Sequence, residues 1–332
     1  MPSAGRKRIL FLYIWTESTW IRRDAEILAE RYDVRKVKVT PLGYLLLPFR
    51  VMRSDLVFAW FGDLHAFFGV LWAKLFRKRS VVVAGGYDVV SMPHIRYGLQ
   101  LRPFARRWSR WAFRHADLVL PVSRSIADDL ARVAPLPLRK VRLVYHGMDH
   151  EAFRPAPGVK RENLVVTVGA VNASNLTRKG LLTFARASRL VPEVPWLLVG
   201  GIVDPSAKEA LQREGGPNLS FAGFVPNDEL VRTLSGAKVY VQPSGHEGFG
   251  ASLAEAMLCG CVPVATRAGA IPEVVGETGL YVPEDDPAAT AAAVREAMTR
   301  DGAVCRERIK TLFPLSKRKR ELLDAVRSVL PE

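Results

Sequence analysis

The stretch Pro243-Ser-Gly-His-Glu247-Gly-Phe-Gly250-Ala-Ser-Leu-Ala-Glu255-Ala-Met257 decides the fold of this 332-residue chain. It follows the apolar run Val239–Gln242, which predicts a buried strand, and its own apolar spacing predicts a helix beginning near Gly250. Gly248 and Gly250 let the backbone pass close to a ligand, because glycine has no Cβ. A strand that enters a helix through such a turn is the repeating unit of parallel α/β sheets.

The same alternation of short β-branched runs and longer amphipathic stretches continues in both directions. The predicted strands are Ile9–Trp15, Val34–Val39, Leu56–Trp60, Ser80–Ala84, Leu118–Val122, Val141–Tyr145, Leu164–Val168, Trp196–Val199, Leu219–Ala222, Val239–Gln242, Val262–Ala265 and Gly279–Val282. The predicted helices of the first half are Trp20–Arg31, Leu64–Phe76, Tyr97–His115 and Ser123–Val133. We therefore expect an α/β fold of two doubly wound, Rossmann-like domains, joined at the linker-like stretch Phe153–Gly158. Their ligands should lie in a cleft beyond the carboxyl ends of the strands.

The bulk composition narrows the class of protein. The chain is 48% hydrophobic and 24% charged, as is usual for globular proteins, and its three cysteines cannot form a disulfide framework. They suggest a reducing, cytoplasmic compartment. The apolar residues near the start predict a strand rather than a signal peptide, and no apolar run is long enough to span a membrane. The net charge of +15 comes almost entirely from residues 1–150, which suggests an anionic partner for that half.

Chemistry at the turn after Val239–Gln242 is suggested by a combination of features. The start of the predicted helix presents free N–H groups and a positive dipole end, which suit a phosphate group. Glu247 precedes the helix and Glu255 lies one turn inside it, and a carboxylate can accept both hydroxyls of a vicinal diol. A sugar nucleotide contains both kinds of group. Two glutamates eight positions apart would by themselves mean only an exposed helix face.

Further segments make a family recognisable. The turn Pro243–Met257, with Gly260-Cys-Val-Pro263 and Gly269-Ala-Ile-Pro-Glu-Val-Val275, resembles the GT-B glycosyltransferases of the large family four, or glycosyl transferases group 1. Phe221–Pro226 and Lys140–Asp149 resemble that family's base-pocket turn and domain junction. The resemblance covers about residues 110–290. It implies an acceptor-binding domain at 1–153, a domain for the nucleotide sugar at 154–305, and a C-terminal helix at 306–332 that can return to the first domain.

The resemblance also implies roles for matching residues. Glu247 would contact the donor sugar near its anomeric carbon, Glu255 would bind the ribose diol, and the backbone at Val225 would meet the base. The side chain of Lys179 would hold the diphosphate. The backbone amides that would assist it are those of Gly248, Phe249, Gly250 and Ala251.

The chain departs from the family pattern at two positions. Ala170 stands where the family has an arginine, and Arg178, beside Lys179, could supply the missing charge. Ala270 stands where glycine is common. The family retains the anomeric configuration of the donor, and the leaving diphosphate takes the acceptor proton. No cofactor and no metal are implied, and the acidic pair Asp285-Asp286 is expected to be a surface turn.

Candidate acceptor-side residues come from the first half. Gly85-Gly-Tyr87-Asp88 follows one predicted strand, and His65 follows another. Asp88 could hold an acceptor hydroxyl or the donor sugar, or it could instead cap the following turn. Tyr87 lies beside it. His65 could face the same cleft or be a surface residue at a helix start.

Other classes of function remain open at this point. A nucleotide-sugar epimerase or a phosphorylase could share the two-domain architecture. A nucleic-acid-binding protein would explain the basic charge, but no binding motif accompanies it. Product analysis separates these alternatives, because only a transferase needs an acceptor and releases nucleoside diphosphate.

A membrane partner is suggested by the segment Leu101–Arg114. On a helix its arginines form a stripe beside bulky rings, which suits the headgroup layer of an anionic membrane. The acceptor would then be a glycolipid or a cell-surface glycan, modified by a peripheral membrane protein. The alternative is that Trp108, Trp111 and Phe113 belong to the core and the arginines only face solvent.

Overall fold

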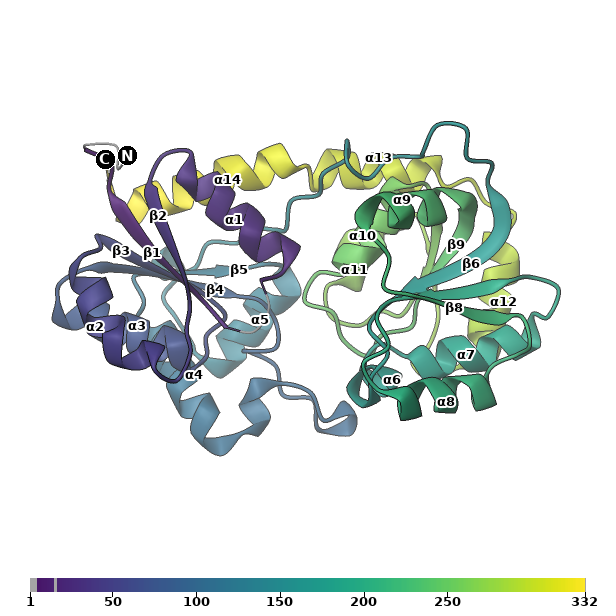
Figure 1. Cartoon of the computed structure of the whole chain (residues 1–332), viewed down its shortest axis with the longest axis horizontal. Helices are drawn as coiled ribbons and strands as arrows, with labels where there is room; N and C mark the ends of the chain where they lie inside the picture. Colours follow the sequence, from purple (N-terminus) through teal and green to yellow (C-terminus); the bar gives the residue numbers. More distant parts are fainter. Residues whose placement is uncertain (1–4, 15–16, 332) are drawn as a thin grey trace. The chain divides into compact units, whose positions relative to one another are not determined.

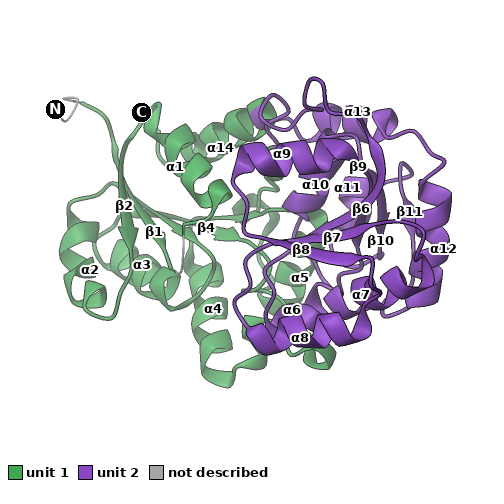
Figure 2. Ribbon diagram, turned by 45° about the vertical axis from the view of Figure 1, so that its right-hand side comes forward, with its two compact units in different colours: residues 1–147, 316–332 green, residues 148–315 purple. Residues whose placement is uncertain are grey.

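The computed structural model describes residues 5–14 and 17–331. The chain divides into two compact units, Met1–Gly147 with Ser316–Glu332, and Met148–Leu315 (Figure 2). Each unit contains one parallel sheet with helices on both faces (Figure 1). The predicted α/β class is therefore confirmed. Trp15, which the sequence placed at the end of the first strand, lies outside the described residues.

The sheet of unit 1 has the strand order β2-β1-β3-β4-β5, and all its pairs are parallel. Its three central strands are fully buried for most of their length, as expected for a sheet covered on both faces. The strands are β1 (Arg8–Tyr13), β2 (Asp33–Lys38), β3 (Leu56–Trp60), β4 (Arg79–Ala84) and β5 (Leu118–Pro121).

The helices of unit 1 cover both faces of this sheet. α1 and α14 lie on one face, and α3 lies on the other with α2 and α4 packed against it (Figure 1). The helices are α1 (Thr19–Ala29), α2 (Gly43–Met52), α3 (Leu64–Leu75), α4 (Pro103–His115), α5 (Arg124–Val133) and α14 (Leu315–Val329). The alternating pattern did not predict α2.

The C-terminal segment differs from the single helix expected at 306–332. It forms two helices, α13 (Ala303–Leu312) in unit 2 and α14, which belongs to unit 1 except for its first residue. A buried ion pair fastens α14 to α1: Arg318 donates from Nε and Nη2 to both oxygens of Asp24, at 2.7 and 2.6 Å. Along the chain, the boundary between the two units falls after Gly147, six residues before the expected boundary at 153.

Two sequence-based assignments in unit 1 are wrong in part. Val141–Tyr145 is not a strand: it runs beside β5 through a single bridge at Val141, and the carbonyls of Val144 and Tyr145 accept hydrogen bonds from Arg318 instead. The helix expected at Tyr97–His115 begins only at Pro103, because proline favours the first helical turn.

The sheet of unit 2 has the order β11-β10-β9-β6-β7-β8 and is also parallel. α7 and α12 cover one face, and α9 and α10 cover the other (Figure 1). The strands are β6 (Glu162–Val168), β7 (Trp196–Val199), β8 (Leu219–Gly223), β9 (Ala237–Gln242), β10 (Val262–Ala265) and β11 (Leu280–Tyr281). The helices are α6 (Ala173–Arg178), α7 (Leu181–Leu190), α8 (Pro205–Glu214), α9 (Asn227–Gly236), α10 (Ala251–Leu258), α11 (Ile271–Val275), α12 (Pro287–Ala297) and α13.

Candidate active site

The strand order of unit 2 identifies one crevice for ligands. The chain runs outward from β6 to β7 and β8, and then returns to form β9 on the other side of β6. In open parallel sheets, ligands bind at such a switch point, beyond the carboxyl ends of the two central strands. Here those ends are followed by the segment 169–180 after β6, which includes the short helix α6, and by the turn 243–250 after β9.

An ion pair joins these two turns. Lys179 donates from Nζ to Oε1 of Glu247 at 3.0 Å, although the two residues are 68 positions apart in the sequence. The side chains are 16% and 12% exposed, so the pair is shielded but still reachable. The structure thus brings together two residues that the sequence singled out separately.

The carboxylate of Glu247 is held by a hydrogen-bond network. Besides Lys179, Gln242 and Ser244 donate to Oε1, at 2.8 and 3.1 Å. Burial by itself would raise the pKa of Glu247, but the charges of Lys179 and Arg178 and these hydrogen bonds outweigh it and hold the pKa below its ordinary value. Glu247 is therefore an anion at neutral pH, fixed in position.

The backbone around Glu247 depends on glycine at two places. Gly250 caps the start of α10 with φ +90°, a left-handed conformation that side chains rarely adopt. Gly269 has φ +58°, and a Cβ there would stand 2.3 Å from the carbonyl oxygen of Glu247. Ala270, where the family commonly has glycine, has an ordinary φ of −84° and donates its N–H to the same carbonyl at 2.9 Å. Alanine is thus accommodated at position 270.

Arg178 directly precedes Lys179 in the sequence. Hydrogen bonds through Asn175 link it to Ala170, the position that lacks the family's arginine. Its guanidinium donates to Oδ1 of Asn175 at 2.6 Å, and Asn175 donates to the carbonyl oxygen of Ala170 at 2.7 Å. The stem of Lys179 passes so close to Gly169 that a Cβ there would stand 2.9 Å from its Cδ. Both cations therefore lie at the carboxyl end of β6.

Glu255 lies on α10 with its side chain partly exposed. Burial raises the pKa of the Tyr240 hydroxyl, and the charges of Glu247 and Glu255 raise it further. Both carboxylates therefore act on one buried phenol at the end of β9. That phenol donates to Oε1 of Gln242 at 3.0 Å, within the network that holds Glu247.

The remaining donor-side candidates differ in what they offer. Phe249 is 3% exposed and its ring packs edge-on against Phe313, so only its backbone can meet a ligand. Gly248 and Ala251 lie on either side of the Phe249-Gly250 pair, in the turn and at the first position of α10. Val225 lies in the turn between β8 and α9 and is partly exposed.

Sequence reasoning missed several residues around this site. Gln242 and Ser244 position Glu247, Asn175 holds Arg178, and His246 is buried next to Glu247. The polar Gln242 at the end of a buried strand was a usable signal, because buried polar groups need partners. Phe224, beside Val225, is 83% exposed, which is unusual for an aromatic ring.

The acceptor-side candidates of unit 1 lie mostly inside the unit. Asp88 is fully buried, and its two oxygens accept hydrogen bonds from the amides of Gly62, Gly85 and Gly86 at 2.7 to 3.1 Å. Burial raises its pKa to about 6, and the backbone hydrogen bonds counter part of that effect. Asp88 therefore ties two loops together and does not face an acceptor. The alternative role as a turn residue is the one the geometry favours.

His65 and Tyr87 are also constrained. His65 is fully buried in α3, its Nε2 lies 2.7 Å from the carbonyl oxygen of Trp60, and burial lowers its pKa to about 4. It is neither the cleft residue nor the surface residue that the sequence suggested. Tyr87 remains partly exposed, with its ring edge-on to Tyr97. Of these candidates only Tyr87 can reach a ligand in this conformation.

The rings of the segment Leu101–Arg114 belong largely to the packing of unit 1. Phe113 is fully buried, and Trp111 stacks on His115 and lies edge-on to Phe67. Trp108 is partly exposed, and only Phe104 is well exposed, at 70%. The arginines thus line an outer surface on which Phe104 is the one well-exposed aromatic ring of this segment.

The comparisons with known proteins identify the family of this chain. The family model of glycosyl transferases group 1 matches residues 162–300, and that of glycosyltransferase family 4 matches residues 17–152. The chain therefore belongs to the family 4, group 1 glycosyltransferases. It is 28% identical over 254 residues to the sulfoquinovosyl transferase of Arabidopsis thaliana, covering 70% of this chain and 48% of that protein.

Another relative is the alpha-maltose-1-phosphate synthase of Mycolicibacterium smegmatis, 32% identical over 57% of this chain and 54% of that protein. The chain thus spans about half the length of these curated relatives. Among solved structures, sucrose-phosphate synthase from Thermosynechococcus elongatus superposes with a TM-score of 0.83 at 22% identity, covering 98% of this chain and 99% of that one. HepE of Anabaena in complex with UDP and glucose superposes with a TM-score of 0.78 at 18% sequence identity. The match covers 97% of this chain and 100% of that one. These structures establish the GT-B fold.

Proposed function

We propose that this protein is a glycosyltransferase that moves a sugar from a nucleoside diphosphate sugar to a hydroxyl acceptor with retention of anomeric configuration. The observation that carries the proposal is the Lys179–Glu247 pair at the switch point of unit 2, beside the start of α10. A fixed anion next to cations and a helix N-terminus suits a donor that develops positive charge at its sugar and negative charge on its diphosphate.

The diphosphate would lie on the cationic side of this site. The amides at the start of α10 and the positive end of its dipole favour an anion there. Lys179 has three N–H donors, of which one is used by Glu247, so the others can bind phosphate oxygens. Arg178, held by Asn175, would add the charge missing at Ala170. Because these groups supply the positive charge, we propose that no metal ion and no cofactor take part.

The sugar and the nucleoside would lie on either side of the diphosphate. Glu247 would stabilise the positive charge that grows at the anomeric carbon as the bond to the diphosphate oxygen breaks. The acceptor oxygen forms the new bond on the same face, and its proton passes to the departing diphosphate. Glu255 would accept the ribose hydroxyls, and the backbone at Val225 would meet the base. A UDP-sugar is our first choice of donor, because HepE was solved with UDP and glucose.

The acceptor is proposed to be a glycolipid or a cell-surface glycan. Unit 1 includes residues 1–147, which hold nearly all of the excess positive charge, and that charge suits an acceptor carried on an anionic surface. Tyr87 is the acceptor-side candidate that remains partly exposed. Within residues 5–14 and 17–331, no helix is long and apolar enough to cross a bilayer.

The test has two steps. A panel of UDP-, GDP- and ADP-sugars is first screened for thermal stabilisation, since a ligand that binds the native state raises the melting temperature. The stabilising donor is then incubated with candidate acceptors with and without EDTA, and the product's anomeric proton is read by NMR. Release of nucleoside diphosphate with retained configuration supports the proposal. An inverted product, or an epimerised donor formed without any acceptor, would overturn it.

A further inference from the structure

Helix α2 exposes an unusual amount of apolar surface. Its inner face, formed by Gly43, Leu47 and Val51, is buried, and the helix packs against α3 (Figure 1). The opposite face is apolar as well. Five large side chains on it are between 45% and 70% exposed: Leu42, Leu45, Leu46, Phe49 and Met52. Their spacing places them on one side of the helix, and a contiguous exposed patch of this kind marks an interaction site.

The segment of chain that contains this face has an excess of positive charge. Residues 34–54 contain five lysines and arginines and no acidic residue. Arg50 and Arg53, at the end of α2, line a pocket of about 180 Å³ together with Arg8 and Arg35. Asp33 also lines it, and Arg8 approaches Asp55 at 3.8 Å. Within the described part of the chain, Arg35, Arg50 and Arg53 form no ion pair.

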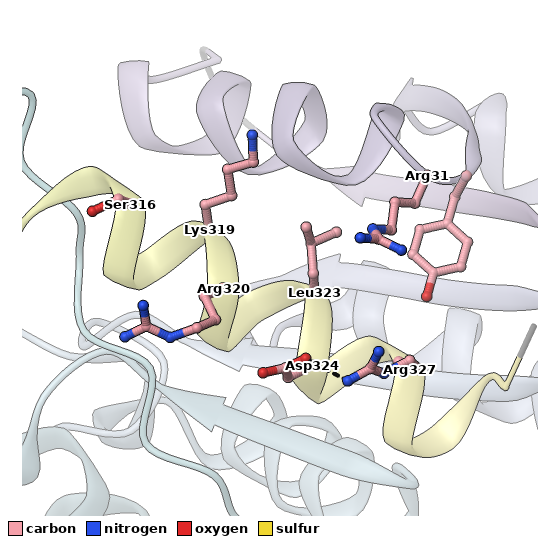
Figure 3. A pocket seen from close by; sticks show the side chains of 8 residues that line it. Arg31, Ser316, Lys319, Arg320, Leu323, Asp324 and Arg327 are labelled. Carbon is pink, nitrogen blue, oxygen red and sulfur yellow. Dashed lines mark hydrogen bonds and ion pairs between the residues drawn. The ribbon is translucent and has the colours of Figure 1, made fainter.

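A second cationic pocket in unit 1 differs from the pocket beside α2 in the pairing of its cations. It measures about 290 Å³ and lies between the end of α1 and α14 (Figure 3). Its Arg327 is paired with Asp324 at 2.8 Å, and its Lys319 with Glu30 at 2.6 Å. These two cations are thus each paired with a carboxylate. The pocket beside α2 combines unbalanced arginines with an exposed apolar helix face.

The exposed apolar face and the adjacent arginines together favour one kind of binding partner. A second copy of the chain, docked through the same face by two-fold symmetry, would bring the two sets of arginines together and be opposed by repulsion. An anionic membrane instead offers hydrocarbon for the apolar side chains and phosphate groups for the arginines. We propose that α2 is the membrane-contacting element of this protein, with its apolar face at the acyl boundary and Arg8, Arg35, Arg50 and Arg53 binding lipid phosphate. This places the contact on α2 and not on Leu101–Arg114, and it does not depend on which sugar is transferred.

The test is cosedimentation of the full-length chain with vesicles at low and high salt. The vesicles are phosphatidylcholine alone or with about 30% phosphatidylglycerol. The apolar variant is Leu45→Ser, Phe49→Ser, Met52→Ser, and its matched control removes exposed apolar side chains elsewhere: Phe104→Ser, Leu138→Ser, Val304→Ser. The charge variant is Arg50→Gln, Arg53→Gln, and its control on α4 is Arg106→Gln, Arg107→Gln.

We expect the wild type to bind anionic vesicles at least about tenfold more tightly than neutral ones, and less at high salt. The apolar variant should lose about tenfold or more in binding, the charge variant several-fold, and both controls less than about twofold. Equal binding to both vesicles, or loss in the α4 control alone, would overturn the proposal. So would a dimer in sedimentation velocity that the apolar variant dissociates.

A failure of the membrane proposal can be distinguished from a failure of the proposed transferase activity. Binding of nucleoside diphosphate and turnover of a soluble acceptor are measured on the same variants without vesicles. Both should stay at wild-type level, because none of the residues assigned to the donor or acceptor side lies on α2 (Gly43–Met52). If they do and vesicle binding is absent, only the membrane proposal falls.

Discussion

Among the described residues, each unit contains one shielded carboxylate–cation pair, and the two pairs differ in geometry. In unit 1, Arg318 and Asp24 are 4% and 0% exposed, and both carboxylate oxygens receive a guanidinium N–H. Trp60 donates a further hydrogen bond to Asp24 at 3.0 Å. In unit 2, Lys179, Gln242 and Ser244 all donate to one oxygen of Glu247, and the pair keeps a small exposed surface.

The difference is the one expected between a structural pair and a pair that we propose to bind a ligand. The Asp24–Arg318 pair is saturated by protein groups, and it joins helices α1 and α14 that are far apart in the chain. The Glu247–Lys179 pair lies at a sheet's switch point, and among the described residues none donates a hydrogen bond to Oε2 of Glu247. Lys179 likewise has donors to spare. The first pair should govern stability and the second turnover.

The largest expected effect is on stability, in Arg318→Met. The change leaves the carboxylate of Asp24 buried without its cation, so the free energy of unfolding should fall by about 3–5 kcal/mol. The double variant Asp24→Asn, Arg318→Met should recover part of this loss, because no charge is left buried. Urea unfolding measures both. A loss under about 1 kcal/mol in the single variant would mean that the pair does not hold α14.

Glu247→Gln should lower turnover and leave stability largely unchanged. The substitution keeps the shape of the side chain and an acceptor for Gln242, but removes the charge that faces the anomeric carbon. We expect kcat to fall by about 100-fold or more, with the affinity for nucleoside diphosphate changed less than about threefold. Initial rates and calorimetry test this, with the melting temperature as a control. Normal turnover would remove the role assigned to Glu247.

A pH dependence of stability should come from Asp88. Its folded pKa of about 6 lies above the ordinary value of 3.8, so the folded state binds this proton more tightly than the unfolded state. The stability contributed by the protonated carboxyl is present below about pH 4 and is lost as the pH rises through about 6. Relative to Asp88→Asn, the wild type should lose on the order of 2–3 kcal/mol across this window. A difference in unfolding free energy that stays constant with pH would contradict this.

Glu255→Ala should act on binding. If Glu255 accepts the ribose hydroxyls, its loss should weaken the donor and free nucleoside diphosphate alike, by about 1–3 kcal/mol. Calorimetry with the nucleoside diphosphate measures this directly. Unchanged affinity would show that the ribose lies elsewhere, even if turnover fell.

The smallest effect is expected at Arg178. Its link through Asn175 to the carbonyl of Ala170 suggests that it replaces the missing arginine. Arg178→Ala should lower kcat by about tenfold, comparable with the loss of one charge-assisted contact, and adding Ala170→Arg should restore part of it. Unchanged kinetics in Arg178→Ala would make it an ordinary surface charge.

Most of the fold was predictable because short apolar runs and amphipathic stretches carry their own periodicity. The exceptions have tertiary causes. Val141–Tyr145 looks like a strand, but its carbonyls bind the guanidinium of Arg318, 173 residues or more away in the chain. α2 has apolar residues on both faces, so it lacks the amphipathic pattern by which the other helices could be recognised.

The candidate site was predictable where its residues are close in sequence. The turn from β9 to α10 contains Glu247, the helix start and Glu255 in one segment, and its glycines have a local reason, since Gly250 has a positive φ. The sequence by itself therefore determined the parallel α/β class, and it placed the two glutamates of the proposed donor site in one strand-to-helix segment.

The tertiary structure alone decided which charged residues face a ligand and which are held inside. Glu247 and Asp88 both follow a buried strand in a glycine-containing turn, but Lys179 meets the first and three backbone amides enclose the second. The partners of a carboxylate come from distant segments, and local periodicity contains no information about them. Burial and pairing set the charge, the pKa and the reach of a side chain, and these depend on the folded arrangement.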